Sequence, residues 1–122
     1  MTARDDLIRA VHEYEALLTH SAGLNAEVPD HRKEAIQVRR RISEMLAAIA
    51  STGNVFFAGG AQGVTFNGHF SKMRSTMAYH QASWPVVSVN YEDADYRASE
   101  TKARKSCQEF IAWVNNVLDV SK

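Results

Sequence analysis

The sequence has few cysteines and prolines and lacks any long hydrophobic run. Its single cysteine, Cys107, excludes a disulfide within the chain and fits a reducing compartment. Only two prolines occur, and 45% hydrophobic with 23% charged residues is the composition of a folded rather than a disordered protein. The most apolar runs, at 45–50 and 110–114, are far shorter than the roughly twenty residues of a membrane span.

The length of the chain and its first residues further restrict the class of protein. A chain of 122 residues predicts one domain, spanning 1–122, with a core large enough to be stable without disulfides or metal. Residues 1–6 are polar and acidic, which excludes an ordinary signal peptide at this end. We therefore expect a soluble, cytoplasmic protein with no membrane partner.

The net charge is zero, but charge is distributed unevenly along the chain. Residues 1–30 carry two basic and six acidic groups, whereas residues 31–50 carry five basic and two acidic groups. An acidic segment followed by a basic one predicts that the two pair with each other, so that their charges are largely used internally rather than offered to a polyanion.

Apolar residues alternately three and four apart recur through the chain. This spacing places one apolar stripe along a helix, and the stripe must be buried against other helices. The stripes are Leu7, Val11, Tyr14 and Leu18; Ala35, Val38, Ile42, Met45 and Ile49; Phe70, Met73, Met77, His80 and Trp84; and Ala103, Cys107, Phe110, Val114 and Val117. We predict a mainly α protein, a helical bundle.

The first two helices are predicted to form an N-terminal αα-hairpin. Thr2 is a suitable N-cap for the first helix, which we expect to end near residue 22 with Gly23 in the left-handed conformation. Pro29 suits the first position of the second helix, which we expect to run to about Ala50 and stop at 51–53. The short connection between them favours an antiparallel pair.

Two further helices are predicted in the second half. Ser71 is the expected cap of a helix over 72–83, which must end before Pro85. Residues 86–89 are a strand candidate or an extended connector. Asn90 is the expected cap of a long C-terminal helix reaching about Val120.

The middle of the chain has a different residue composition. Residues 54–67 interleave glycines with β-branched and aromatic residues, which fits either a short β-hairpin around a loop at 59–63 or an apolar loop packed against the helices. Both alternatives remain open. Five of the six glycines lie within residues 53–68: Gly53, Gly59, Gly60, Gly63 and Gly68.

No catalytic or metal-binding signature is present, and we assign no catalytic residue, metal or cofactor. The five histidines are never three or four residues apart, the spacing that places two ligands on one helical face. Cys107 belongs to an apolar stripe, so we expect a buried structural thiol. We therefore lean against an enzyme.

The segment 56–84 is rich in aromatic and methionine side chains. Such a segment fits a core, an interface or an apolar pocket with a few polar groups. For the pocket alternative, the candidate ligand-binding residues are Phe57, His69, Arg74, His80 and Trp84. A small apolar or aromatic molecule would be the ligand.

The end of the last helix is apolar on more than one face, including Phe110, Trp113 and Val117. Such a face is either sandwiched within the domain or covered by a second subunit. These three residues are the candidate interface of a homo-oligomer. A non-enzymatic, self-associating interaction module is therefore our first functional hypothesis, and a small-molecule binder or small enzyme is the alternative.

The third hypothesis is nucleic-acid binding through the basic run of the second helix. Arg32, Lys33, Arg40 and Arg41 spread around the helix instead of lining one face. A DNA-reading helix usually belongs to a net basic domain, and this chain is neutral. We therefore consider nucleic acid an unlikely partner.

Overall fold

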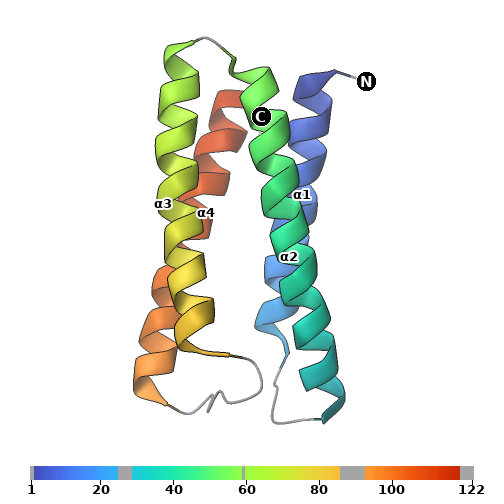
Figure 1. Cartoon of the computed structure of the whole chain (residues 1–122), viewed down its shortest axis with the longest axis vertical. Coiled ribbons are helices and arrows are strands. Elements are labelled where there is room, and N and C mark those ends of the chain that lie inside the picture. Colours follow the sequence, from blue (N-terminus) through green and yellow to red (C-terminus); the bar gives the residue numbers. More distant parts are fainter. Residues whose placement is uncertain (1, 25–28, 59, 86–92, 119–122) are drawn as a thin grey trace.

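A computed structural model describes residues 2–24, 29–58, 60–85 and 93–118, and four long helices make up most of them (Figure 1). The helices are α1 (Ala3–Ala22), α2 (Pro29–Phe56), α3 (Ala61–Ser83) and α4 (Ala94–Leu118). No strand occurs among these described residues. The prediction of a mainly α bundle with an N-terminal αα-hairpin and a long C-terminal helix is confirmed.

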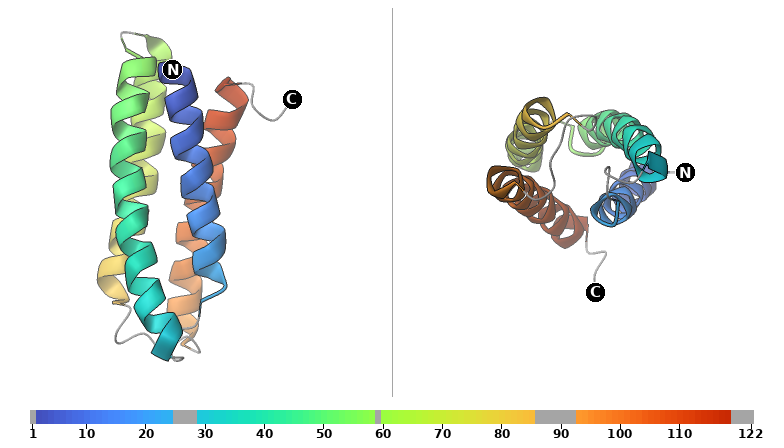
Figure 2. Two further views of the ribbon diagram at one scale, coloured as in Figure 1. Left: turned by 90° about the vertical axis from the view of Figure 1, so that its right-hand side faces the viewer. Right: turned by 90° about the horizontal axis from the view of Figure 1, so that it is seen from below.

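The helices run alternately down and up the long axis (Figure 1). Each packs against its neighbour in the chain, and α1 also packs against α4. The end-on view of Figure 2 shows the resulting ring of four helices around a central axis. The Arg4 guanidinium donates a hydrogen bond to the Leu118 carbonyl at 2.6 Å, which joins the start of α1 to the end of α4.

The helix starts follow the capping signals in the sequence. The Thr2 hydroxyl accepts a hydrogen bond from the Asp5 amide at 3.1 Å, so Thr2 is the N-cap of α1 as predicted. Pro29 begins α2, also as predicted. The Asp93 carboxylate accepts from the Asp95 amide at 2.7 Å and so caps α4. The expected cap Asn90 lies outside the described residues.

The end of α1 differs from the prediction in one respect. Gly23 is the C-cap, but its φ of −87° and ψ of −4° are right-handed rather than left-handed. Its amide donates to the carbonyl of His20 at 3.1 Å, which closes the helix with a tighter final turn. The strand candidate at 86–89 falls outside the described residues.

The glycine-rich segment forms neither a β-hairpin nor a long loop where the structure describes it. Instead α2 continues to Phe56 and α3 begins at Ala61, ten residues before the predicted cap Ser71. The reason is tertiary: a Cβ on Gly53 would overlap the ring of Phe66, and one on Gly63 would lie 2.6 Å from the Phe57 carbonyl oxygen. Glycine at these positions lets the two helix ends approach closely, and the buried aromatic rings compensate for its low helix propensity.

Most residues of the predicted stripes form the core, whereas Leu18, Trp84 and Val117 are only partly buried. Leu7, Val11, Ile49, Met73 and Val114 are fully buried, as is Cys107, the expected structural thiol. One cross-helix ion pair has the predicted sense: the Arg41 guanidinium of α2 binds the Glu13 carboxylate of α1. His20 of α1 lies 2.8 Å from Glu34 of α2, a contact in which the acidic residue belongs to the second helix. None of the helices that the structure describes has both the length and the hydrophobicity of a membrane-spanning segment.

Candidate functional site

A cavity of about 220 Å³ lies near the end of the bundle where α1 and α3 finish and α2 and α4 begin. All four helices contribute to its wall. The lining residues are Leu18, Ser21, Ala22, Leu24, Ala35, Arg39, Ile42, Met77, His80, Gln81, Tyr96, Glu100, Ala103 and Arg104. A pocket between several helices of a bundle is a usual place for a ligand.

The apolar part of the wall comes from the inward stripes of the helices. Leu18, Ile42 and Met77 reach it from α1, α2 and α3. Ala35 and Ala103 occupy inward positions on α2 and α4, where a larger side chain would fill the centre. Because these two alanines are small, a space remains between the helices beside them. At other positions along the bundle, larger apolar side chains fill the centre.

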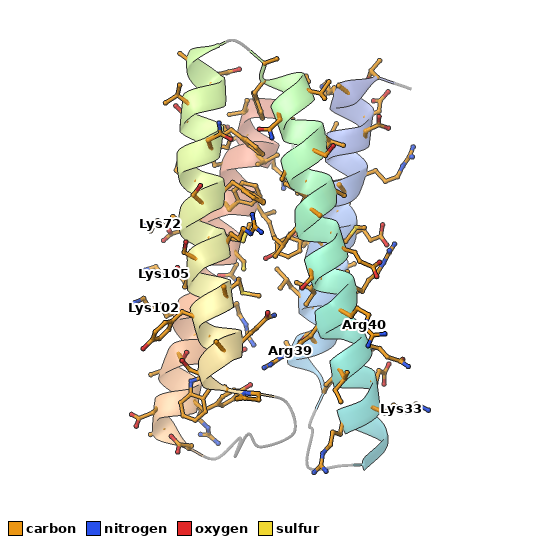
Figure 3. The ribbon with its side chains drawn as sticks, in the orientation of Figure 1. Lys33, Arg39, Arg40, Lys72, Lys102 and Lys105 are labelled. Carbon is orange, nitrogen blue, oxygen red and sulfur yellow. The ribbon has the colours of Figure 1, made fainter. Side chains whose placement is uncertain are left out.

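Arg39 is the most conspicuous polar group of the wall. Its side chain reaches from α2 toward α3, whereas Lys33 and Arg40 of the same helix point outward (Figure 3). Its Nη2 atom donates a hydrogen bond to the backbone carbonyl of Trp84 at 2.9 Å. This bond satisfies a carbonyl at the end of α3 and holds the guanidinium at the cavity.

His80 brings a buried imidazole to the opposite wall. The residue is 7% exposed, and its Nδ1 atom is hydrogen-bonded to the Ser99 hydroxyl at 2.7 Å. Its ring also contacts that of Tyr96, with centroids 5.6 Å apart. Burial lowers the pKa of His80, and the positive charge of Arg39 lowers it further. The imidazole is therefore neutral at pH 7.

The remaining charges of the wall belong to α4. The Arg104 guanidinium forms an ion pair with the Glu100 carboxylate one helical turn away. With His80 neutral, the wall carries two guanidinium groups and one carboxylate. The cavity is therefore an apolar space with these charged groups at its edge.

The five predicted ligand-binding residues do not converge. Phe57 lies at the far end of the bundle, 5.8 Å from Trp113 between ring centroids, and His69 stacks on the same Trp113 at 5.0 Å. Arg74 is exposed on α3. His80 lines the cavity, whereas Trp84 is not among its lining residues, and the Trp84 ring contacts that of Tyr96.

The aromatic segment is mainly core at the far end. The rings of Phe57, Phe66, Phe70 and Phe110 form one cluster, in which Phe57 and Phe66 lie 5.0 Å apart and Phe70 and Phe110 lie 5.7 Å apart. A second hollow, of about 400 Å³, opens beside the α2–α3 turn. Glycine, asparagine and apolar residues line it and no charged residue does, so it offers less to recognise a ligand.

The three predicted interface residues are largely covered by their own chain. Phe110 is 1% exposed and belongs to the core, so it is not part of an accessible surface of the folded chain. Trp113 and Val117 are partly buried and pack against the same core. The apolar excess of α4 is thus covered mostly within the domain, and the homo-oligomer stays a prediction.

The sequence reading missed Arg39, although a signal was present. Arg39 is four residues after Ala35 and three before Ile42, so it shares their face of α2. Arg39 also adjoins Arg40 and Arg41 in the basic run, where a charged side chain is usually exposed, and this favours a surface position. Glu100 has the same relation to Tyr96 and Ala103 on α4.

Among the described residues, no three His, Cys, Asp or Glu side chains are grouped as metal ligands. Comparison of this chain with protein-family models, curated proteins and solved structures finds no match.

Proposed function

We propose that this protein is a non-enzymatic binding protein that takes one small, largely apolar molecule into the cavity between its four helices. The composition of the cavity wall supports this proposal most strongly. Every helix supplies apolar side chains to it, and a few polar groups lie together at its edge. Its volume of about 220 Å³ is below the roughly 300–1,000 Å³ of pockets for drug-sized ligands. The ligand is therefore small.

Binding fits the polar groups better than catalysis does. The two arginines and the histidine of the wall are each held by another part of the chain: Arg39 by the Trp84 carbonyl, Arg104 by Glu100 and His80 by Ser99. The hydroxyl that is hydrogen-bonded to the His80 imidazole, that of Ser99, is not part of the cavity wall. A nucleophile must reach the bound substrate, so this pair does not form a catalytic dyad for a ligand in the cavity.

The test is to fill the cavity. Ala103→Leu adds three carbons at a buried wall position, whereas Ala98→Leu makes the same change at an exposed site on the same helix. Neutral probes such as octanamide, 1-hexanol and indole should raise the melting temperature and shift the methyl NMR signals of Leu18, Ile42 and Met77. We expect Ala103→Leu to abolish these effects and Ala98→Leu to keep them. Shifts absent for every probe, or unchanged in Ala103→Leu, would contradict the proposal.

Self-association is a second candidate function, favoured by exposed valines at the other end of the bundle. Val55 on α2 and Val64 on α3 are 66% and 76% exposed, and both lie beside the α2–α3 turn. A pair of exposed apolar side chains at one end suits contact with a second copy. Sedimentation velocity should then show a dimer that Val64→Glu dissociates and Ala78→Glu, on an exposed part of the same helix, does not. A monomer at all micromolar concentrations would exclude this candidate.

A further inference from the structure

We propose that the four-helix cavity selects an uncharged ligand with one hydroxyl group, a small alcohol or phenol, and that the Nε2 atom of His80 binds this hydroxyl. This proposal rests on the proposed function, because it names the class of molecule that the cavity takes. The observation behind it is a buried imidazole at the wall of an apolar space, with one of its two nitrogens already held inside the bundle.

The first step concerns the nitrogen of His80 that meets the cavity. Nδ1 is hydrogen-bonded to the Ser99 hydroxyl at 2.7 Å, and Ser99 does not line the cavity. Nε2 has no hydrogen-bond partner within the part of the chain that the structure describes. Every buried side-chain nitrogen and oxygen of that part has such a partner, so Nε2 is not enclosed in the core and borders open space. The open space that His80 lines is the cavity.

The second step concerns the charge of the ligand. The carboxylate of Glu100 is paired with Arg104, and the Arg39 guanidinium donates to the Trp84 carbonyl. The lowered pKa of His80 leaves its imidazole neutral at pH 7. An ionised ligand would lose its hydration in this apolar space and would have to displace a partner within the chain to regain an opposite charge. An uncharged ligand leaves these contacts in place.

The third step concerns the kind of polar group. A neutral imidazole has one N–H and one bare nitrogen, so Nε2 either donates or accepts a hydrogen bond. The Ser99 hydroxyl can take the complementary role at Nδ1 in both tautomers. A ligand hydroxyl likewise donates or accepts, and therefore pairs with Nε2 in both tautomers, whereas a carbonyl pairs only with an N–H. An analogue without the hydroxyl leaves the buried nitrogen unpaired and is disfavoured.

The fourth step concerns the rest of the ligand. Met77 lies three residues before His80 on α3, so both side chains share one face of this helix. Leu18 and Ile42 complete the apolar wall from α1 and α2. These three side chains offer no hydrogen-bonding group beyond the weakly accepting Met77 sulfur. A cavity of about 220 Å³ therefore holds one short apolar chain or ring that carries the hydroxyl.

The test compares p-cresol with p-xylene, which have the same shape and differ by a hydroxyl in place of a methyl group. Phenols are uncharged at pH 7.5. Because p-xylene is the more hydrophobic of the two, the informative quantity is how far one substitution weakens each ligand. The variant His80→Phe keeps a ring and removes both nitrogens. We expect it to weaken p-cresol about fivefold more than p-xylene in methyl NMR titrations, the factor that one net hydrogen bond contributes.

The variant His69→Phe is the matched control. It makes the same change on the same helix, at an exposed residue that stacks on Trp113 at the far end of the bundle. It should weaken neither ligand. If His80→Phe unfolds because the bond to Ser99 is lost, ¹⁵N NMR of the unmodified protein replaces it. We then expect p-cresol to shift the Nε2 signal of His80, p-xylene to leave it unchanged, and the exposed His12 to respond to neither.

The outcomes separate this proposal from the proposed function. Equal weakening of both ligands in His80→Phe, or a His80 Nε2 signal that p-cresol leaves unchanged, would overturn the role of His80. The cavity would still be a ligand site if Ala103→Leu excluded both ligands. Failure of p-cresol to bind, while the neutral set of octanamide, 1-hexanol and indole does bind, would also overturn this proposal alone. Failure of p-cresol, p-xylene and the neutral set together would remove the proposed function and this proposal with it.

Discussion

The hydroxyl oxygen of Tyr14 lies 3.0 Å from the Sγ atom of Cys107 in the centre of the bundle. The two residues are 93 positions apart in the chain, and their hydrogen bond joins α1 to α4. The same hydroxyl donates to the Sδ atom of Met73 on α3 at 3.3 Å. A buried hydroxyl needs such partners, and here two sulfur atoms supply them. One buried hydroxyl group therefore links three helices, α1, α3 and α4.

Removal of this hydroxyl should destabilise the fold without changing it. Tyr14→Phe keeps the ring in place but leaves the Cys107 thiol and the Met73 sulfur without their partner. We expect the free energy of unfolding to fall by about 1 kcal/mol, the usual net value of one hydrogen bond. Chemical denaturation measures this change. Tyr79→Phe is the matched control, because Tyr79 is 75% exposed and its loss of a hydroxyl should have no effect.

Burial at this position makes Cys107 an unreactive thiol. The residue is fully buried, and burial raises the pKa of the thiol against the smaller opposing effect of the Tyr14 hydrogen bond. Since the thiolate is the reactive form, Ellman's reagent should leave the native protein unmodified and react promptly after unfolding in guanidinium chloride. Rapid labelling of the native protein would show that the bundle opens at this position.

Two helical glycines should respond oppositely to alanine. Gly53→Ala places a Cβ in the volume occupied by the Phe66 ring, so we expect a loss of about 1–3 kcal/mol in the free energy of unfolding. Gly68→Ala meets no atom within 4 Å and should stabilise α3 by about 0.5–1 kcal/mol through helix propensity. Thermal unfolding of both variants checks the signs. Equal changes in stability for the two variants would mean that the contact between Gly53 and Phe66 does not require glycine.

These glycines also show which part of the fold a sequence can specify. The stripes that contain Val11, Ile42 and Val114 are predictable because burial follows the helical period within each segment. The region 54–67 is not, because glycine with β-branched and aromatic residues favours strand or loop locally. What makes it helical is the contact of Gly53 with Phe66, which depends on where α3 lies relative to α2.

In the candidate site, too, some residues can be predicted from the sequence and others cannot. His80 belongs to a stripe, and its placement near an apolar space follows from the periodicity. Arg39 could be found only by giving its position on the face of Ala35 more weight than its charge. That Leu18 and Ala103 meet around one cavity depends on the order of helices around the axis, and periodicity within single helices carries no such information.

Nucleic-acid binding by the basic run should be weak and sensitive to salt. Arg41 is engaged by the carboxylates of Glu13 and Glu44, while Lys33 and Arg40 point outward (Figure 3). Few phosphates can be neutralised by such a surface, so affinity rests on a small release of counterions. Fluorescence anisotropy with duplex DNA and single-stranded RNA should show binding at 50 mM salt at most, and none at 200 mM. Tight, sequence-dependent binding at 200 mM would restore this hypothesis.

The stability of the fold should decrease below neutral pH because of His80. Its pKa in the folded protein is lowered from the ordinary 6.5 by burial and by the charge of Arg39. As the pH falls through 6.5, the unfolded chain therefore binds a proton that the folded chain does not, and the free energy of unfolding decreases. Above 6.5 both states are neutral at this position and the contribution is complete. One proton limits the slope to about 1.4 kcal/mol per pH unit.

The variant His80→Gln separates this residue from other titrating groups. Glutamine cannot be protonated, so the decrease in stability between pH 7.5 and 5.5 should become shallower than in the unmodified protein. His12→Gln is the control, because His12 is exposed on α1, and it should keep the original slope. Urea denaturation at half-unit steps of pH measures both curves. A slope unchanged by His80→Gln would mean that His80 accepts a proton as readily in the folded protein as in the unfolded chain, contrary to its burial beside Arg39.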